Sequence, residues 1–239
     1  MEWEAWGNGG MGCWDPIPHH PTTPFPRFLS MIFTVHRYHS VSSTNDVAAG
    51  QPEGTVIIAG EQTAGKGRRG RKWSSPPGEG LYLSIVLHPS LPYNKLWQMA
   101  FVVSLAACEA IREVSGLDAR IKLPNDILIN GRKVCGILID SKPLPHSHTP
   151  TPPYSVVAGI GINVNNQSFP SDLNATSIAL ELGQTISMAD MENALLSSLD
   201  ARYSQFLADG FPPILEAWKS PELHNEPPGE VDLSSGRMV

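Results

Sequence analysis

The sequence has few cysteines, no long apolar run and no signal for secretion. Its three cysteines, Cys13, Cys108 and Cys135, are sparse and odd in number, so no disulfide framework is expected and a cytoplasmic location is predicted. No run reaches the roughly 18 apolar residues that a membrane-spanning helix needs. The N-terminus carries Glu2 and Glu4 in place of the apolar region of a secretory signal.

Positive charge is also in deficit, with 17 Lys and Arg residues against 23 Asp and Glu residues, for a net charge of −6. A general nucleic-acid binder is therefore disfavoured, because such proteins gain most of their affinity by neutralising phosphates. The cations that are present cluster: Lys66, Arg68, Arg69, Arg71 and Lys72 fall within seven positions. This cluster departs from the composition of the rest of the chain.

The order of apolar patterns predicts one mixed α/β domain, of the α+β type, over residues 32–219. Residues 1–31 are expected to form a disordered extension, and residues 220–239 a short polar tail. Strands are predicted over 32–36, 55–59, 81–87, 119–122, 127–129, 133–140 and 155–164. Helices are predicted over 94–114, 187–208 and 211–218, with a short one after Ser43. Asn130 and Gly131 predict a hairpin turn.

The cationic cluster lies in a glycine-rich loop, residues 60–80, that separates two predicted strands. Glycines let backbone amides approach an anion closely, and arginines offer bidentate geometry to phosphate or carboxylate. One interpretation is a loop that wraps a phosphorylated ligand; the other is a solvated basic loop. A P-loop is excluded, because Gly67 replaces the metal-binding Ser or Thr and the glycines and prolines that follow prevent a helix.

Lys122 to Asp126 form a second candidate motif between two predicted strands. Lys122 at a strand end can direct a compact charge into a cleft. Asn125 and Asp126 supply oxygen ligands suited to a hydrated Mg²⁺. The alternative is a turn in which both side chains only cap the backbone, and the residues alone favour it.

Two further motifs involve glycines and small polar residues. Gly159 and Gly161 lie in a predicted strand, which indicates close approach of a ligand or of another backbone. Ser43, Thr44 and Asn45 form a helix N-cap that could also bind a polar ligand head. The sequence contains no indication of a nucleophilic triad, and a metal site at the histidines of the proline-rich loop, residues 142–153, is a weak alternative.

Taken in order over residues 33–219, these motifs resemble the biotin protein ligases, also called biotin–[acetyl-CoA-carboxylase] ligases. The shared pattern is Ser-Thr-Asn, a Gln before a glycine- and arginine-rich loop ending in Trp, K-x-P-N-D, Gly-Ile-Leu and G-x-G-I-N. The resemblance implies the mixed-sheet fold of biotin and lipoate ligases, which is similar to class II aminoacyl-tRNA synthetases. Each motif alone is weak, whereas five in the same order are specific.

The family's reaction consumes biotin and ATP, with Mg²⁺, to form biotinyl-5′-AMP and pyrophosphate. A lysine of a biotin carboxyl carrier domain of acetyl-CoA carboxylase then displaces AMP. Such chemistry needs positive charge around the reacting carboxylate and α-phosphate and needs water to be excluded, but it needs no protein nucleophile. The resemblance also makes a homodimer an expectation.

The family's binding roles carry over by motif position. The biotin head group is expected to contact Ser43, Thr44, Asn45 and Gln62. The floor beneath biotin is expected at Gly136, Gly159 and Gly161. The adenylate is expected to contact Lys66, Gly67, Arg68 and Lys122. Arg68 and Lys122 are the catalytic candidates, and Arg71 and Trp73 are expected to support the nucleotide loop.

The chain also departs from the family pattern. Lys66 replaces the usual Arg, and Leu123 replaces the usual Trp. We expect no helix-turn-helix ahead of the catalytic region, hence no DNA binding, and too few residues after Lys219 for the family's C-terminal β-barrel domain. Two alternatives follow: a lipoate or octanoate ligase or transferase of the same fold, and a biotin-binding sensor that transfers nothing.

Overall fold

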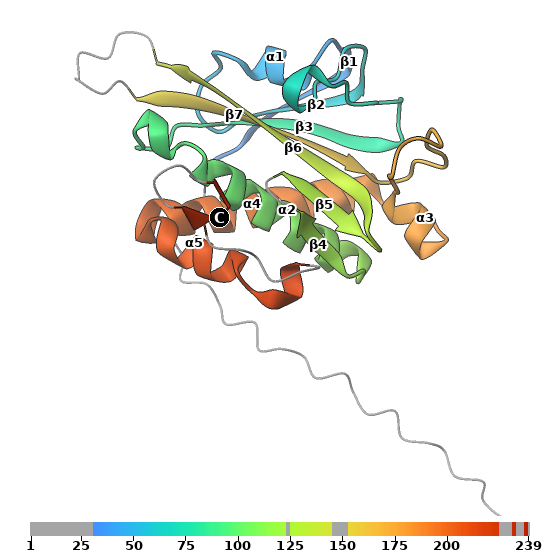
Figure 1. Ribbon diagram of the computed structural model, residues 1–239. Coiled ribbons are helices and arrows are strands. Elements are labelled where there is room, and N and C mark those ends of the chain that lie inside the picture. Colours follow the sequence, from blue (N-terminus) through green and yellow to red (C-terminus); the bar gives the residue numbers. More distant parts are fainter. Residues whose placement is uncertain (1–30, 123–124, 145–152, 225–230, 233–236, 239) are drawn as a thin grey trace, which may run out of the picture.

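The computed structural model describes residues 31–122, 125–144, 153–224, 231–232 and 237–238. Within these ranges one seven-stranded sheet, with strand order β1-β2-β3-β7-β6-β5-β4, forms the centre of the fold (Figure 1). Its strands are β1 Thr34–Val41, β2 Thr55–Gln62, β3 Gly80–Leu87, β4 Ala119–Lys122, β5 Asp126–Ile129, β6 Arg132–Pro143 and β7 Tyr154–Asn163. The expectations for residues 1–30 and for His146 and His148 fall outside the described residues.

The sheet is mixed, as predicted: β1 runs parallel to β2, and every other neighbouring pair is antiparallel. The two central strands, β3 and β7, are buried along almost their whole length, because their Val, Ile and Leu side chains meet protein on both faces. In this register Gly161 of β7 lies opposite both Tyr82 of β3 and Gly136 of β6. Two glycines therefore stand side by side in the middle of the sheet.

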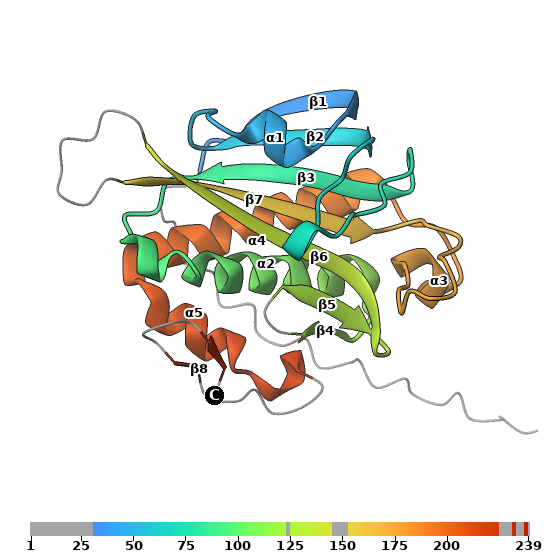
Figure 2. The same ribbon diagram turned by 45° about the horizontal axis from the view of Figure 1, so that its top comes forward.

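Helices α2 (Gln98–Ser115) and α4 (Met188–Asp209) cover one face of the sheet, and α5 (Phe211–Trp218) packs against these two helices (Figures 1 and 2). Phe101 of α2 packs against Trp218 of α5, with ring centroids 4.7 Å apart, inside the large apolar core. The opposite face carries the short helix α1 (Thr44–Ala48), whose Ala48 lies in a small separate cluster with Ile57 and Val86. No helix in the described part of the chain is both long and apolar enough to cross a membrane.

Several boundaries differ from the sequence-based expectation. Strand β1 starts later and ends at Val41, and β2 continues to Gln62, because these two edge strands pair along their length. Helix α3 (Ile178–Leu182) was not predicted; a five-residue helix lacks a readable period, although Ser177 caps it and Gly183 ends it in a left-handed conformation. The turn at Asn130 and Gly131 is confirmed, with φ of 51° and 74°.

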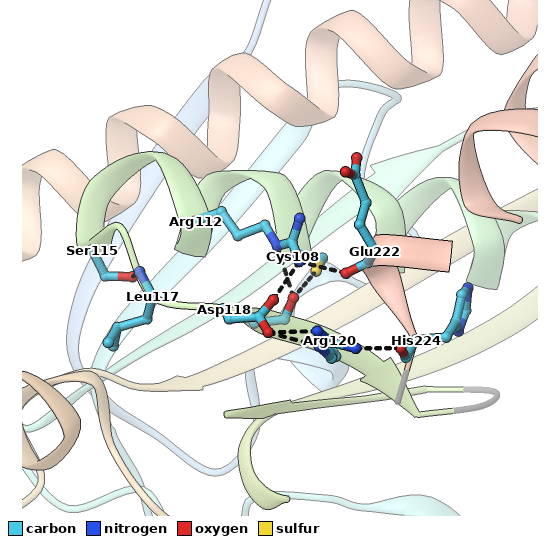
Figure 3. A network of polar contacts seen from close by, with 9 residues as sticks. Cys108, Arg112, Ser115, Leu117, Asp118, Arg120, Glu222 and His224 are labelled. Atoms are coloured by element: carbon cyan, nitrogen blue, oxygen red, sulfur yellow. Dashed lines mark hydrogen bonds and ion pairs between the residues drawn. The ribbon is translucent and has the colours of Figure 1, made fainter. Parts of the chain in front are cut away.

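The packed domain also extends beyond Lys219, the expected boundary. The short helix at Pro221–Leu223 places His224 in a buried position beside β4. Arg112 of α2 donates to the Glu222 carbonyl at 2.6 Å, and Arg120 of β4 donates to the His224 carbonyl at 2.7 Å (Figure 3). These arginines fix the segment after α5 against β4.

Candidate functional site

A cavity of about 340 Å³ lies on the face of the sheet that carries α1. Its volume is in the range of small-molecule sites, which run to roughly 300–1,000 Å³. The segment between β2 and β3 crosses this face in front of β6 and β7 (Figure 2). The cavity is lined by residues of α1, β2, this segment, β6, β7 and the loop that follows β7.

Most of the predicted site residues meet in this cavity. They are Ser43, Thr44, Asn45, Gln62, Lys66, Gly67, Arg68, Arg71, Trp73, Asp126, Gly136, Gly159 and Gly161. They come from segments more than a hundred residues apart in sequence, so only the fold brings them together. Lys122 and Asn125 are absent from the described residues that line it.

The polar end of the cavity is built by helix α1 and the end of β2. Thr44 and Asn45 are buried there, and the Thr44 backbone N–H donates to Gln62 Oε1 at 2.8 Å. The Thr44 hydroxyl lies 3.1 Å from the same oxygen. Ser43 precedes the helix and makes no side-chain cap bond, so its hydroxyl is not used by the helix end.

Gly136, Gly159 and Gly161 form a glycine floor to the cavity, but protein side chains rest on it. A Cβ at Gly159 would lie 2.1 Å from Asn45 Oδ1, and a Cβ at Gly161 would lie 2.4 Å from Trp73 Nε1. Both distances are far below van der Waals contact. These glycines therefore let the Asn45 amide and the Trp73 indole approach the sheet.

Trp73 and Lys133 form the centre of the cavity. The Lys133 ammonium lies 5.2 Å from the centroid of the Trp73 ring, within cation–π range, and forms an ion pair with Asp126 at 2.7 Å. The Trp73 Nε1–H is buried and finds no hydrogen-bond partner among the described residues. An unpaired buried donor is costly, which marks this nitrogen as a group that a ligand acceptor would stabilise.

Two contacts hold the cationic loop against the domain. Arg68 Nη1 donates to Asn125 Oδ1 at 2.8 Å, next to β5. Lys66 forms an ion pair with Asp46 of α1. Arg69 adopts a left-handed backbone with φ of 57°, so the loop turns sharply between its cations. The loop therefore lies against the cavity, and its predicted site residues line it.

Lys133 was not among the predicted residues, whereas Lys122 was. Lys122 is exposed at the end of β4. Lys133 faces the cavity because of a β-bulge: Ile127 pairs with Cys135 but Leu128 pairs with Lys133, so Val134 is an extra residue. Val134 and Cys135 are both buried in the core, and the shift places Lys133 on the same face as Gly136. Strict alternation of the sequence predicts the opposite face, and no local signal reveals the bulge.

The loop after β7 was also missed by the sequence reasoning. Residues 168–170 and 173–175 also line the cavity. The Lys133 backbone N–H donates to the Asn174 carbonyl at 3.0 Å, and the Thr176 N–H donates to the Lys133 carbonyl at 2.9 Å. Asn163 Nδ2 donates to the Thr176 carbonyl at 3.0 Å. The loop thus fixes the backbone that carries Lys133.

The residues predicted to hold Mg²⁺ do not fit a metal site in this structure. Asn125 Oδ1 accepts a hydrogen bond from the Arg68 guanidinium, and Asp126 Oδ1 pairs with the Lys133 ammonium. One oxygen of each of these two side chains thus already faces a cation. The described residues contain no group of three or more His, Cys, Asp and Glu side chains that could hold an ion.

The two described cysteines are not nucleophiles. Burial raises the pKa of Cys108 to about 12, and burial raises the pKa of Cys135 well above its ordinary value. Both thiols stay protonated at neutral pH, which agrees with the predicted core position of Cys108. Burial also raises the pKa of Tyr82, whose phenol therefore stays protonated and donates to the carbonyl of Pro76 at 3.0 Å at the end of the loop.

The chain matches known proteins over the part that builds this cavity. Residues 38–163 match the Biotin/lipoate A/B protein ligase family. The bifunctional ligase/repressor BirA of Bacillus subtilis is 38% identical over 193 residues, covering 77% of this chain and 58% of the relative. The biotin–[acetyl-CoA-carboxylase] ligase of Paracoccus denitrificans is 33% identical over 179 residues, covering 72% of each protein.

The same relationship holds for the fold. The biotin protein ligase of Aquifex aeolicus, solved in complex with biotin and ATP, superposes with a TM-score of 0.68 at 28% identity, covering 78% of this chain and 77% of that one. The chain spans a little over half the length of the Bacillus relative. These matches include the predicted motifs and confirm the expected mixed-sheet fold, so the chain belongs to the biotin/lipoate A/B protein ligase family.

Proposed function

We propose that this protein is an ATP-dependent biotin–protein ligase. In the first step a carboxylate oxygen of biotin bonds to the α-phosphorus of ATP, and pyrophosphate leaves. In the second step the amine of a carrier lysine attacks the carboxyl carbon of biotinyl-5′-AMP, AMP leaves, and the amine loses a proton. ATP enters as its magnesium complex, so the ion is part of the substrate.

The observation that supports this function best is that one cavity is lined both by uncharged polar side chains and by cationic side chains. Thr44, Asn45 and Gln62 offer amide and hydroxyl groups suited to the ureido ring of biotin. Arg68 and Lys133 line the same cavity and offer positive charge to the carboxylate and the α-phosphate of the two substrates. The Aquifex structure contains biotin and ATP, in agreement with this pairing.

Each remaining residue of the cationic part has a proposed role. Lys66 and Gly67 contact the adenylate phosphate, and Arg71 supports the loop. Lys133 lines the cavity, whereas Lys122 is exposed at the end of β4, so Lys133 is the alternative to Lys122 as the group that stabilises developing charge. A loop that lies over the cavity also limits hydrolysis of the adenylate.

The proposed acceptor is a biotin carboxyl carrier domain of acetyl-CoA carboxylase, as the name of the Paracoccus relative implies for that protein. Cytoplasmic location, a homodimer and the absence of operator binding stay predictions. Light scattering of the purified protein tests the second of these, and titration with DNA at low salt tests the third.

The decisive assay mixes the purified protein with biotin, MgATP and a carrier domain. Pyrophosphate release and a mass increase of the carrier, both dependent on ATP, support the ligase. Biotin binding without pyrophosphate release would identify a sensor instead. Thermal stabilisation by lipoate or octanoate, but not by biotin, would identify a lipoate-type enzyme of the same family, because ligands raise apparent stability by mass action.

A further inference from the structure

A chain of hydrogen bonds lies behind the polar end of the cavity. Its centre is Ser84 of β3, which is fully buried and is not among the described residues that line the cavity. The Ser84 hydroxyl lies 2.7 Å from Asn45 Oδ1 and 2.7 Å from Thr44 Oγ1. Ser84 thus contacts two of the three residues that form the polar end.

The orientation of the Asn45 amide follows from its two partners. Asn45 Nδ2 donates to Asp140 Oδ2 at 2.8 Å, and an ionised carboxylate can only accept, so the nitrogen must face Asp140. The amide oxygen then accepts the Ser84 hydroxyl and lies against Gly159. The hydrogen-bond donor that Asn45 has left is the second hydrogen of its NH₂ group.

The Gln62 amide is fixed in the same way. Its Oε1 accepts from the Thr44 backbone N–H, a group that can only donate. Its Nε2 donates to the Ser75 hydroxyl at 2.8 Å, and Ser75 lies outside the described residues that line the cavity. These two contacts fix which way the Gln62 amide faces and leave one hydrogen of its NH₂ group for a ligand.

We propose that Ser84, Asp140 and Ser75 are positioning residues that set the polarity of the head-group subsite. They orient Asn45 and Gln62 so that both amides have N–H donors left for the ligand. Because this subsite presents N–H donors, it favours a ligand that places a carbonyl oxygen against them, such as the ureido oxygen of biotin. It disfavours a ligand that places a cationic N–H donor there. This inference rests on the proposed function.

The first test uses protein without ligand and compares Ser84→Ala with Ser104→Ala. Ser104 is a matched control, because it is equally buried and its hydroxyl donates to the Phe101 carbonyl of its own helix, away from the residues of the head-group subsite. We expect the side-chain NH₂ signals of Asn45, followed by NMR, to exchange with water at least tenfold faster in Ser84→Ala and to be unchanged in Ser104→Ala. Equal behaviour of the two variants would overturn the positioning role.

The second test measures dissociation constants for biotin and for protonated 2-iminobiotin, in which a cationic nitrogen replaces the carbonyl oxygen. We expect Ser84→Ala to reduce the preference for biotin by about tenfold, the scale of one misplaced hydrogen bond. A purely structural role would weaken both ligands equally and leave the ratio unchanged, which would refute the proposal.

Asp140 offers a further comparison. Asp140→Ala should reduce the same ratio, whereas Asp140→Asn should keep it, because an amide oxygen can still accept from Asn45. If both variants lose the preference for biotin over 2-iminobiotin, or if neither does, the role of Asp140 is contradicted. A wild-type protein that binds neither biotin nor its analogue would refute the proposed function, while the NMR comparison would still decide the positioning role.

Discussion

Replacing Lys133 by Met separates the charge of this residue from its packing. The methionine side chain keeps an apolar stem near the Trp73 ring. In the wild-type protein the Lys133 ammonium lies 5.2 Å from the centroid of this ring. The change removes one positive charge from the cavity and leaves Asp126 without its ion-pair partner. We expect adenylation to slow strongly while the protein stays folded.

The magnitude follows from the surroundings of the charge. The Lys133 side chain is only 27% exposed, so solvent screens it less than a surface lysine. A charge roughly 4 Å from a developing anion contributes about 4 kcal/mol at an effective dielectric of about 20. Loss of one preorganised donor of this kind typically costs about 10²–10³ in rate. Asp126 already neutralises part of the charge, so we expect the lower half of that range.

The assay measures pyrophosphate release with biotin and MgATP in single-turnover conditions, and its control is Lys122→Met. Lys122 is exposed at the end of β4, so its replacement should change the rate less than about threefold. The reverse outcome, a slow Lys122 variant and a normal Lys133 variant, would refute the geometric reasoning and support the role that the sequence motif assigns to Lys122. Circular dichroism of both variants establishes that the comparison concerns folded protein.

Three further predictions concern the loop, the floor and the thiols. Gly161→Ala should displace the Trp73 indole, because the new Cβ would lie 2.4 Å from Nε1; titration should show weaker biotin binding and a changed tryptophan emission, and unchanged values for both would contradict the geometry. Arg68→Gly removes a contact that holds the loop, so free biotinyl-AMP should escape and label bystander proteins, whereas labelling confined to the carrier would count against loop closure by this residue. Cys108 and Cys135 should resist alkylation at pH 8 in folded protein and react after unfolding, since burial raises the pKa of both thiols; peptide mapping by mass spectrometry detects either result.

The fold was readable from the sequence where local patterns and tertiary packing agree. Strand β3 is a short run of mostly apolar residues, and helix α4 buries apolar residues at helical spacing. The Asn130-Gly131 pair favours the left-handed backbone that a tight hairpin turn requires. The short helix α3 and the true length of β1 were not readable, because pairing and capping, not apolar period, determine them.

The same distinction between local sequence patterns and tertiary packing applies to the candidate site. Thr44, Gln62 and Arg68 occur in motifs whose residue types suit the ligand, and the cavity contains them. The position of Lys133 in the cavity depends on one extra residue in β6, which moves the Lys133 side chain to the other face of the sheet. This shift is visible only when β6 is paired with β5. The glycine floor was predicted to meet a ligand directly, but its first contacts are an amide and an indole of the protein itself.

Gln62 lies at the polar end of the cavity and also joins the two ends of the loop. Gln62 accepts from Thr44 at the polar end, and its side chain donates to Ser75 at the far end of the loop. The backbone makes the same connection, since the Gln62 N–H donates to the Ser75 carbonyl and the Trp73 N–H donates to the Gly65 carbonyl. The base of the loop is therefore fixed by the residue that faces the head group. A ligand that engages the remaining N–H of Gln62 would therefore contact the same side chain that joins the two ends of the loop.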